Sequence, residues 1–235
     1  MRTIKFKVIL FSLIFAMIMS GCKSPRNVEA QDEEFYHGPP YITVCFVPMD
    51  GISKGEMTRL MKDFKEKFAD SQFEPYFVDS FEAVMTPDSC MNKKYHRLDA
   101  KKMLAFLNNK YSAPAEETSV KNGDGKALTM FHIIGVTDKD ISTAVHGKEN
   151  YGIMGLSYLG SGWCRASVVS TYRLPRKKDL WKLATHEFCH GFYSAKHCPD
   201  DDPSCIMADA KGRNPHFERK DSLCITCASW CLYGD

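Results

Sequence analysis

The stretch that organises this chain is His186-Glu187-Phe188-Cys189-His190, followed by His197-Cys198, Cys205-Ile206-Met207 and Cys224-Ile225-Thr226-Cys227. Two histidines four residues apart lie one above the other on a single helical face, so both imidazoles can reach one metal ion. The glutamate between them would then lie beside a metal-bound water, as in a catalytic Zn²⁺ site. The same pattern also arises by chance on an ordinary amphipathic helix. The segments around it therefore have to decide between the two interpretations.

Residues 179–192 are expected to form the helix that carries both histidines. Its buried face should hold the apolar residues at helical spacing, which are Leu180, Leu183, Ala184 and Phe188. Asp179 is suited to cap the start of the helix, and Gly191 stands where the helix could bend or end.

A catalytic zinc needs a third protein ligand and one open position for water. His197 is the nearest residue that can supply this ligand once the chain turns back after the helix. The alternative for His197 is an ordinary exposed loop histidine. The fallback ligands are Asp200, Asp201, Asp202 and, more distantly, His216.

Four cysteines downstream have the spacing of a second metal site. Cys198, Cys205, Cys224 and Cys227 form a C-x6-C … C-x2-C set, and the Cys-x-x-Cys pair is a usual half-site for tetrahedral Zn²⁺. A closed four-thiolate site would pin the C-terminal segment to the domain. Disulfide bonding is the alternative, because an exported chain meets an oxidising compartment. Cys231 is a surplus thiol that could replace either ligand of the terminal pair.

The composition is that of an ordinary globular protein. The 235 residues are 44% hydrophobic and 26% charged, which is enough for a real core in one medium domain or two small ones. The formal net charge is +2, and the expected loss of Arg2, Lys5 and Lys7 with a leader takes the 31 basic residues to 28 against 29 acidic ones. Nothing in this balance calls for a nucleic-acid partner.

The N-terminus is expected to direct export. Residues 1–21 are typical of a signal peptide, and Met19-Ser20-Gly21-Cys22 resembles a bacterial lipobox, so Cys22 would carry the lipid. The apolar run from Val8 to Met19 is too short for a spanning helix, which needs roughly 20 residues. Residues 22–39 are then a polar tether and residues 40–235 a single domain. The protein would be lipid-anchored to a bacterial membrane, in the periplasm or at the cell surface.

Hydrophobic patterning upstream predicts an α/β (α+β) domain with a mixed, mostly parallel sheet and packed helices. Strands are expected at residues 41–47, 75–78, 128–136, 151–159 and 165–172, and helices from Ser53, its N-cap, to Phe68 and over residues 99–110. Residues 112–126 are expected to form a loop, because they contain Ala-Pro-Ala and Asn-Gly-Asp-Gly.

Taken in order, these motifs resemble the archaemetzincins, a branch of the metzincin-like zinc proteases. The upstream segments Ile134 to Asp140 and Val169 to Leu174 are also similar to that family, and the resemblance runs from Ile42 to Cys227. It implies a metzincin-like fold with two zinc ions, one catalytic and one structural, and a methionine turn at Met207. The residues that it assigns are a general base at Glu187, catalytic-zinc ligands at His186, His190 and His197, and structural-zinc ligands at Cys198, Cys205, Cys224 and Cys227.

The chain departs from the family pattern after the second histidine. The family has glycine where Tyr193 stands and its third histidine where Lys196 stands, so His197 comes one residue late. A left-handed turn at a residue other than glycine costs roughly 1–2 kcal/mol. Gly191 or the extra residue is therefore expected to reshape the bend. The gap between Cys198 and Cys205 is also longer than in the family.

The function that the resemblance implies is hydrolysis of peptide bonds by a zinc-activated water with Glu187 as general base. Peptides or proteins would be the substrates, with aminopeptidase and endopeptidase action both open. Tyr172 or Tyr193 could assist, and a strand within residues 151–159 could pair with an extended peptide. The alternatives are a catalytically impaired, zinc-stabilised binding or scaffold lipoprotein and a disulfide-stapled protein without metal. The oligomeric state is not specified by the sequence.

Overall fold

A five-stranded sheet forms the centre of the domain. The computed structural model describes residues 41–69, 76–118, 129–145, 147–158, 164–200, 202–209 and 217–233. The strands lie in the order β2-β1-β5-β9-β8 and comprise β1 (Tyr41–Pro48), β2 (Tyr76–Ser80), β5 (Thr129–Thr137), β8 (Gly155–Tyr158) and β9 (Cys164–Ser170). All neighbouring pairs are parallel except β8, which pairs antiparallel with β9 at the edge. The predicted mixed, mostly parallel sheet is therefore confirmed.

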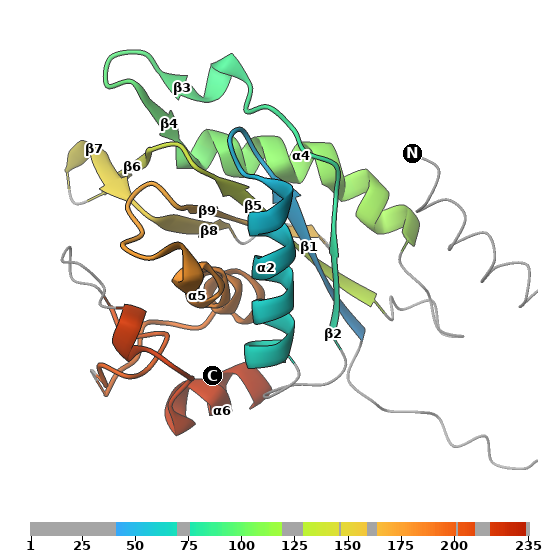
Figure 1. The fold of residues 1–235 in the computed structure, drawn as a ribbon, viewed down its shortest axis with the longest axis vertical. Coiled ribbons are helices and arrows are strands. Elements are labelled where there is room, and N and C mark those ends of the chain that lie inside the picture. Colours follow the sequence, from blue (N-terminus) through green and yellow to red (C-terminus); the bar gives the residue numbers. More distant parts are fainter. Residues whose placement is uncertain are drawn as a thin grey trace, which may run out of the picture. The chain divides into compact units, whose positions relative to one another are not determined.

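The two faces of this sheet border separate cores, because side chains alternate along each strand. Phe46 and Ile134 belong to the core under α2 and α5, whereas Val47 and Ile133 belong to the core under α4. The three helices are α2 (Lys54–Phe64), α4 (Ala100–Thr118) and α5 (Leu180–Tyr193). Figure 1 shows α2 and α5 on one side of the sheet and α4 on the other. Burial on both faces explains why the strands are β-branched and aromatic runs.

Helix α2 begins as predicted. The Ser53 hydroxyl accepts a hydrogen bond from the Glu56 backbone N–H at 3.2 Å, and the Glu56 carboxylate accepts one from the Ser53 N–H at 3.1 Å. This reciprocal capping box satisfies donors that the first turn leaves unpaired. A π-helical turn, Lys65–Ala69, continues the helix, and Phe64 and Phe68 are fully buried against the sheet.

Helix α4 is longer than predicted. Its inward residues Met103, Leu104 and Leu107 are buried as expected, and so is Leu98, which lies in the strand just before the helix. The expected loop from Ser112 is wrong as far as Thr118, because the helix continues to that residue. Alanine and glutamate favour helix in this stretch and outweigh the cost of Pro114, which lacks a backbone N–H to donate. The rest of the expected loop, residues 119–128, lies outside the described residues.

The predicted strand 151–159 is two strands in two sheets. Its first half belongs to a second sheet of order β3-β4-β6-β7, formed by β3 (Met91–Asn92), β4 (Arg97–Asp99), β6 (Ile141–Val145) and β7 (Lys148–Ile153). The chain bends at Met154, and β8 then joins the main sheet. The residue pattern predicts extended backbone but not which neighbour each half pairs with, so the sequence alone missed the division.

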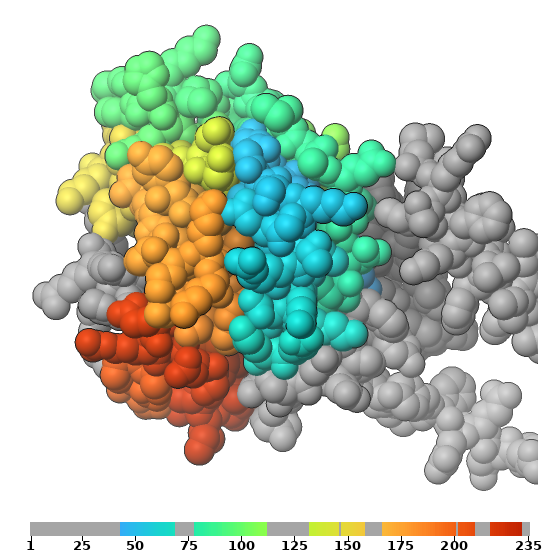
Figure 2. All heavy atoms as spheres, viewed as in Figure 1, coloured from blue at the N-terminus to red at the C-terminus, as the bar shows by residue number. Residues whose placement is uncertain are grey.

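The C-terminal segment packs against α5. It contains a 3-10 turn, Phe217–Arg219, and helix α6 (Ile225–Tyr233), and its residues Leu223, Cys227 and Cys231 join the core under α5. Figure 2 shows these C-terminal residues, in red, directly beside the orange residues of the α5 region. Among the helices that the structure describes, none has the length and apolar character needed to cross a membrane. The expected leader, the lipidated Cys22 and the tether lie outside the described residues.

Candidate zinc centres

Helix α5 carries the two histidines of the motif. It runs from Leu180 to Tyr193, within one residue of the predicted range. The expected side-chain cap at Asp179 is wrong. The Asp179 carboxylate instead accepts a hydrogen bond from Arg176 at 2.6 Å and lies 3.6 Å from the Lys182 ammonium. Two nearby cations offer this buried carboxylate stronger partners than the helix N–H groups do.

His186 and His190 are oriented by backbone carbonyls. Their Nδ1 atoms lie 2.8 Å from the Ile206 carbonyl oxygen and 2.6 Å from the Ala195 carbonyl oxygen. A carbonyl oxygen only accepts, so each Nδ1 donates its hydrogen and each Nε2 keeps a lone pair. The two Nε2 atoms lie 3.0 Å apart. The rings therefore present two acceptors to the same small volume.

His197 reaches the same place through a tight turn after the helix. Ser194 adopts the left-handed conformation with φ of 58°, and the Ala195 N–H donates to the Cys189 carbonyl at 3.1 Å. Of the two expected causes of the changed bend, Gly191 is excluded, because it stays helical and the turn falls at Ser194. Ligand nitrogens of His186, His190 and His197 then lie within 4.8 Å of one another. The turn thus retains the third histidine despite the shifted spacing.

The donor set of this histidine cluster fits a zinc ion. Two nitrogen lone pairs 3.0 Å apart repel each other unless a cation lies between them. Tetrahedral zinc with bonds of 2.0–2.1 Å sets neighbouring nitrogens about 3.3 Å apart, close to this separation. Burial lowers the pKa of all three imidazoles, and the charge of His190 lowers the pKa of His186 and His197 further. The rings are therefore neutral near pH 7, which is the form that binds metal.

Glu187 lies between the two histidines and is turned towards the edge of the main sheet. Its carboxylate accepts a hydrogen bond from the Ser157 hydroxyl of β8 at 2.6 Å. Burial raises the pKa of Glu187 to about 7, although the hydrogen bond from Ser157 opposes the shift. A carboxyl group that changes its charge near neutral pH is suited to accept and return a proton. Ser157 is a residue that sequence reasoning missed.

The four predicted cysteines form a second cluster. Ligand sulfurs of Cys198, Cys205, Cys224 and Cys227 lie within 4.8 Å of one another, and Cys198 Sγ and Cys224 Sγ are 3.7 Å apart. Tetrahedral zinc with bonds of about 2.3 Å sets sulfurs about 3.8 Å apart, whereas a disulfide requires about 2.05 Å. These four thiols are free. Their spacing fits a zinc ion and not a pair of disulfides.

Backbone groups tune the thiols of this cysteine cluster. The Cys224 N–H donates to Cys205 Sγ at 3.4 Å and the Cys227 N–H donates to Cys224 Sγ at 3.5 Å. Burial raises the pKa of the Cys224 thiol, but the hydrogen bonds outweigh burial and leave that pKa below its ordinary value. Burial raises the pKa of Cys205 to about 11. A cation at the centre would stabilise the thiolates that burial otherwise disfavours.

A buried lysine binds the backbone of the segment from Cys205 to Ala208. Lys220 donates to the Ala208 carbonyl at 2.5 Å and to the Cys205 carbonyl at 3.4 Å. Met207, the predicted methionine turn, is fully buried, and its carbonyl accepts the Cys198 N–H at 2.9 Å. The segment from Cys205 to Ala208 is therefore fixed by its backbone as well as by its thiol.

The other residues considered from the sequence lie elsewhere or have other partners. Asp200 accepts a hydrogen bond from Thr226, and Asp202 accepts hydrogen bonds from Ser204. Asp201 and His216 lie outside the described residues. Tyr193 packs edge-to-face on Phe188 and Phe192, and Tyr172 is 62% exposed. Cys231 is buried in the core and is not a member of the cysteine cluster.

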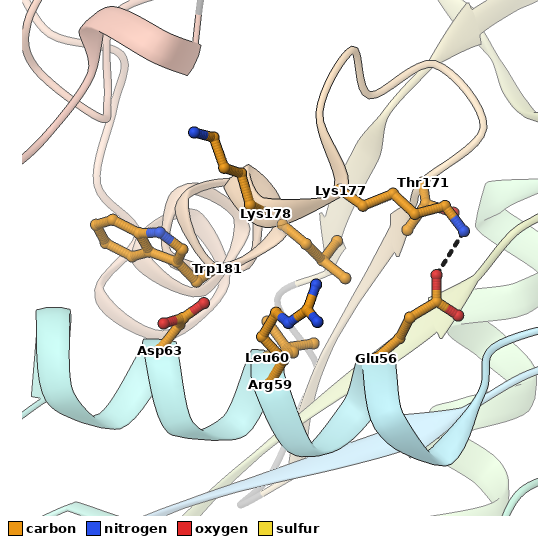
Figure 3. A pocket seen from close by; sticks show the side chains of 9 residues that line it. Glu56, Arg59, Leu60, Asp63, Thr171, Lys177, Lys178 and Trp181 are labelled. Atoms are coloured by element: carbon orange, nitrogen blue, oxygen red, sulfur yellow. Dashed lines mark hydrogen bonds and ion pairs between the residues drawn. The ribbon is translucent and has the colours of Figure 1, made fainter.

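A separate crevice lies between α2 and the start of α5 (Figure 3), with a volume of about 130 Å³. Glu56 and Lys177 form an ion pair of 2.5 Å at its edge, and this hydrogen bond lowers the pKa of Glu56 to about 2. Its lining residues are Glu56, Arg59, Leu60, Asp63, Thr171, Lys177, Lys178, Leu180 and Trp181, none of which belongs to either cluster. The crevice is therefore separate from both candidate metal sites.

Comparison with known proteins gives a likeness of fold. No protein-family model and no curated protein matches the sequence. The archaemetzincin of Methanopyrus kandleri superimposes with a TM-score of 0.56 at 20% identity, covering 83% of this chain and 95% of that one. A zinc-dependent peptidase from Methanocorpusculum labreanum superimposes with a TM-score of 0.60 at 18% identity, covering 80% of this chain and 99% of that one. The archaemetzincin of Archaeoglobus fulgidus, complexed with malonate, superimposes with a TM-score of 0.52 at 21% identity, covering 80% of this chain and 98% of that one. The predicted metzincin-like architecture is confirmed, and this chain has a fold similar to that of the archaemetzincins.

Proposed function

We propose that this chain is a zinc-dependent peptidase whose histidine cluster holds a catalytic zinc and whose general base is Glu187. One observation carries the proposal: the Nε2 atoms of His186 and His190 lie 3.0 Å apart while both Nδ1 atoms face carbonyl oxygens. Two nitrogen lone pairs this close together can both coordinate a single metal ion. His197 supplies a third nitrogen, which leaves a fourth tetrahedral position for water.

The chemistry follows from the groups that surround that position. Zinc, when bound, would supply a Lewis acid that lowers the pKa of water and polarises a peptide carbonyl. Glu187 would take a proton from the water as its oxygen bonds to the carbonyl carbon. The same carboxyl group would give this proton to the amine nitrogen as the C–N bond breaks. A pKa raised to about 7 by burial suits both transfers.

The cysteine cluster is proposed to hold a second, structural zinc through Cys198, Cys205, Cys224 and Cys227. Four thiolates close the coordination shell and leave no position for water, which is typical of structural sites. The proposal therefore requires two zinc ions per chain.

The comparisons support this assignment at the level of fold. The relatives of known structure are described as archaemetzincins and as a zinc-dependent peptidase. Peptides or proteins are accordingly the proposed substrates of this chain. Cleavage at the amino terminus and cleavage within a chain have to be separated by experiment.

The test is hydrolysis by wild type and by Glu187→Gln, each loaded with zinc. Fluorescence-quenched peptide libraries report internal cleavage, and amino-acid 4-nitroanilides report cleavage at the amino terminus. We expect wild-type hydrolysis to stop with 1,10-phenanthroline and to return with added zinc. Glu187→Gln should lose about 10²–10⁴-fold in kcat, the contribution of a positioned base, while it keeps its metal. Equal turnover by the two proteins would remove Glu187 from the mechanism.

We also propose that the protein is exported and lipid-anchored to a bacterial membrane through Cys22. Residues 1–21 would be the signal peptide, residues 22–39 the tether and residues 40–235 one domain. The experiment is metabolic labelling with palmitate in a bacterial host. Wild type should carry label and sediment with membranes, whereas Cys22→Ala should carry none. A labelled Cys22→Ala protein would contradict the anchor.

A further inference from the structure

Three polar side chains form a row behind Glu187, on the sheet face that α5 covers. They are His132 on β5, Ser167 on β9 and Ser157 on β8, which are neighbouring strands. Ser157 lies directly opposite Ser167 in the antiparallel pair. His132 and Ser167 are fully buried. Buried polar groups are costly unless they are hydrogen bonded, so a row of them needs a physical reason.

The hydrogen bonds of this row lead to the general base. His132 Nε2 lies 2.8 Å from Ser167 Oγ, Ser167 Oγ lies 3.3 Å from Ser157 Oγ, and Ser157 Oγ lies 2.6 Å from Glu187 Oε2. The two hydroxyls also lie 3.1 Å and 2.6 Å from the Glu187 carbonyl oxygen. The row thus contacts both the side chain and the backbone of one residue.

Counting hydrogens gives the row a direction. Each serine hydroxyl has a single hydrogen to donate. With the ring hydrogen of His132 on Nε2, His132 donates to Ser167, Ser167 donates to Ser157, and Ser157 donates to the Glu187 carboxylate. Every hydrogen is used once in this order, and the Glu187 carbonyl oxygen is a second acceptor for both serine hydroxyls. The Ser157 hydrogen is left for Glu187, whose carbonyl and carboxylate oxygens both lie 2.6 Å away, and the negative charge favours the carboxylate.

Two glycines let α5 lie close enough for these bonds. A Cβ on Gly191 of α5 would lie 2.6 Å from His132 Cε1 and 3.0 Å from Ser167 Oγ. A Cβ on Gly155 of β8 would lie 2.5 Å from Glu187 Oε1. An alanine at Gly191 would meet the buried His132 ring, and an alanine at Gly155 would displace the Glu187 side chain. The helix and the strands therefore pack closely at the residues of this row and at Glu187.

We propose that Ser157 is the positioning residue of Glu187, and that Ser167 and His132 hold the Ser157 hydroxyl in its donating orientation. The inference rests on the proposed function, because it assigns Ser157 a role through the base. Without its partner the carboxylate would sample other rotamers, and a general base acts only within hydrogen-bond reach of the proton that it takes. Ser157 acts through Glu187 and is not itself assigned to contact substrate.

The test compares Ser157→Ala with Ser157→Thr, which keeps a hydroxyl in a strand. Ser170→Ala is the matched control, since Ser170 is a buried serine of β9 whose hydroxyl donates to the Lys139 carbonyl at 2.6 Å. On a fluorescence-quenched peptide that wild type cleaves, Ser157→Ala should lower kcat about 10- to 100-fold, part of the effect of a positioned base. KM should change by less than about twofold, Ser157→Thr should recover most of kcat, and Ser170→Ala should match wild type.

A second readout does not depend on turnover. Acetohydroxamic acid is a metal chelator with an N–H and an O–H that can donate to a carboxylate, and its binding to the cobalt-loaded protein should change the visible spectrum. Ser157→Ala should bind it about three- to tenfold more weakly, as when one charge-assisted hydrogen bond is disturbed. Unchanged kcat and unchanged affinity in Ser157→Ala, or equal losses in Ser170→Ala, would overturn the proposal. If wild type cleaves no peptide, the proposed function fails, while weakened binding in Ser157→Ala would still support the positioning role.

Discussion

His197 and Cys198 are neighbours in the chain, yet the imidazole of one belongs to the histidine cluster and the thiol of the other to the cysteine cluster. The two clusters are also linked through Cys205 and Ile206, which are neighbours in the chain. Cys205 belongs to the cysteine cluster, and the carbonyl of the next residue, Ile206, accepts the Nδ1 hydrogen of His186 at 2.8 Å. Whatever fixes the four thiols therefore also fixes two of the three histidines.

Replacing a thiol of the cysteine cluster should weaken both sites. We expect Cys224→Ser to lose the structural zinc and to lower Tm sharply, because structural zinc contributes apparent binding energies of about 10–16 kcal/mol to small folded sites. The histidine cluster should also bind zinc more weakly, since His197 and Ile206 lose their anchors. Zinc content by mass spectrometry and thermal unfolding measure the two effects.

Cys90→Ala is the control for that change. Cys90 is buried in the core under α4, away from both clusters, and should cost no more than an ordinary small cavity. A Cys224→Ser protein that keeps two zinc ions and a wild-type Tm would contradict the structural site.

His197→Ala tests the third ligand. Loss of a direct ligand should exceed the 10- to 100-fold effect of residues that only support one, so zinc affinity of the histidine cluster should fall more than about 100-fold. Competition with a chelating dye measures the affinity. Asp200→Asn is the matched control, because Asp200 is engaged by Thr226 and should leave the affinity unchanged. If Asp200→Asn lowered the zinc affinity and His197→Ala left it unchanged, Asp200 would be the third ligand.

The pH dependence follows from Glu187. Burial raises its pKa to about 7, and a general base must be ionised to act. The value of kcat/KM should therefore fall as the pH drops through the pKa and level off above it. A bound cation favours the carboxylate, so the midpoint should lie at about 7 or lower. A profile that stays flat from about pH 5 to 8, with zinc content constant throughout, would show that Glu187 does not keep its raised pKa in the zinc-loaded protein.

The close approach of α5 to the sheet can be tested with three glycines. Gly191→Ala should destabilise the protein by about 1–3 kcal/mol, the usual cost of overpacking, because its Cβ would overlap His132. Gly155→Ala should displace the Glu187 carboxylate and lower kcat with both zinc ions retained. Gly55→Ala is the control: no atom lies within 4 Å of its Cβ, so stability should be unchanged or higher by about 0.4–1 kcal/mol. Urea unfolding measures the free energies, and a neutral Gly191→Ala would contradict the packing.

Features determined by residues close together in the chain were predictable. The helix with His186 and His190 depends on a four-residue spacing, and the start of α2 depends on Ser53 and Glu56, three residues apart. Both patterns follow from helical geometry alone. The spacing of Cys224 and Cys227 likewise indicates a metal half-site without knowledge of the fold.

Features determined by distant partners were not predictable. The row that ends on Glu187 exists because β5, β9 and β8 are adjacent, and nothing local to Ser157 indicates which strand lies beside it. Asp179 fails as a side-chain cap because Arg176 and Lys182 bind it instead. The bend that brings in His197 falls on Ser194, although its strained left-handed backbone would favour glycine.

Anomalous diffraction at the zinc edge, from crystals of the zinc-loaded protein, would show whether each cluster holds a zinc ion. We expect one peak about 2.0–2.1 Å from nitrogens of His186, His190 and His197, and a second peak about 2.3 Å from the sulfurs of the cysteine cluster. A structure with no peak among the histidines, or with His197 turned away from a metal held by His186 and His190, would contradict this expectation.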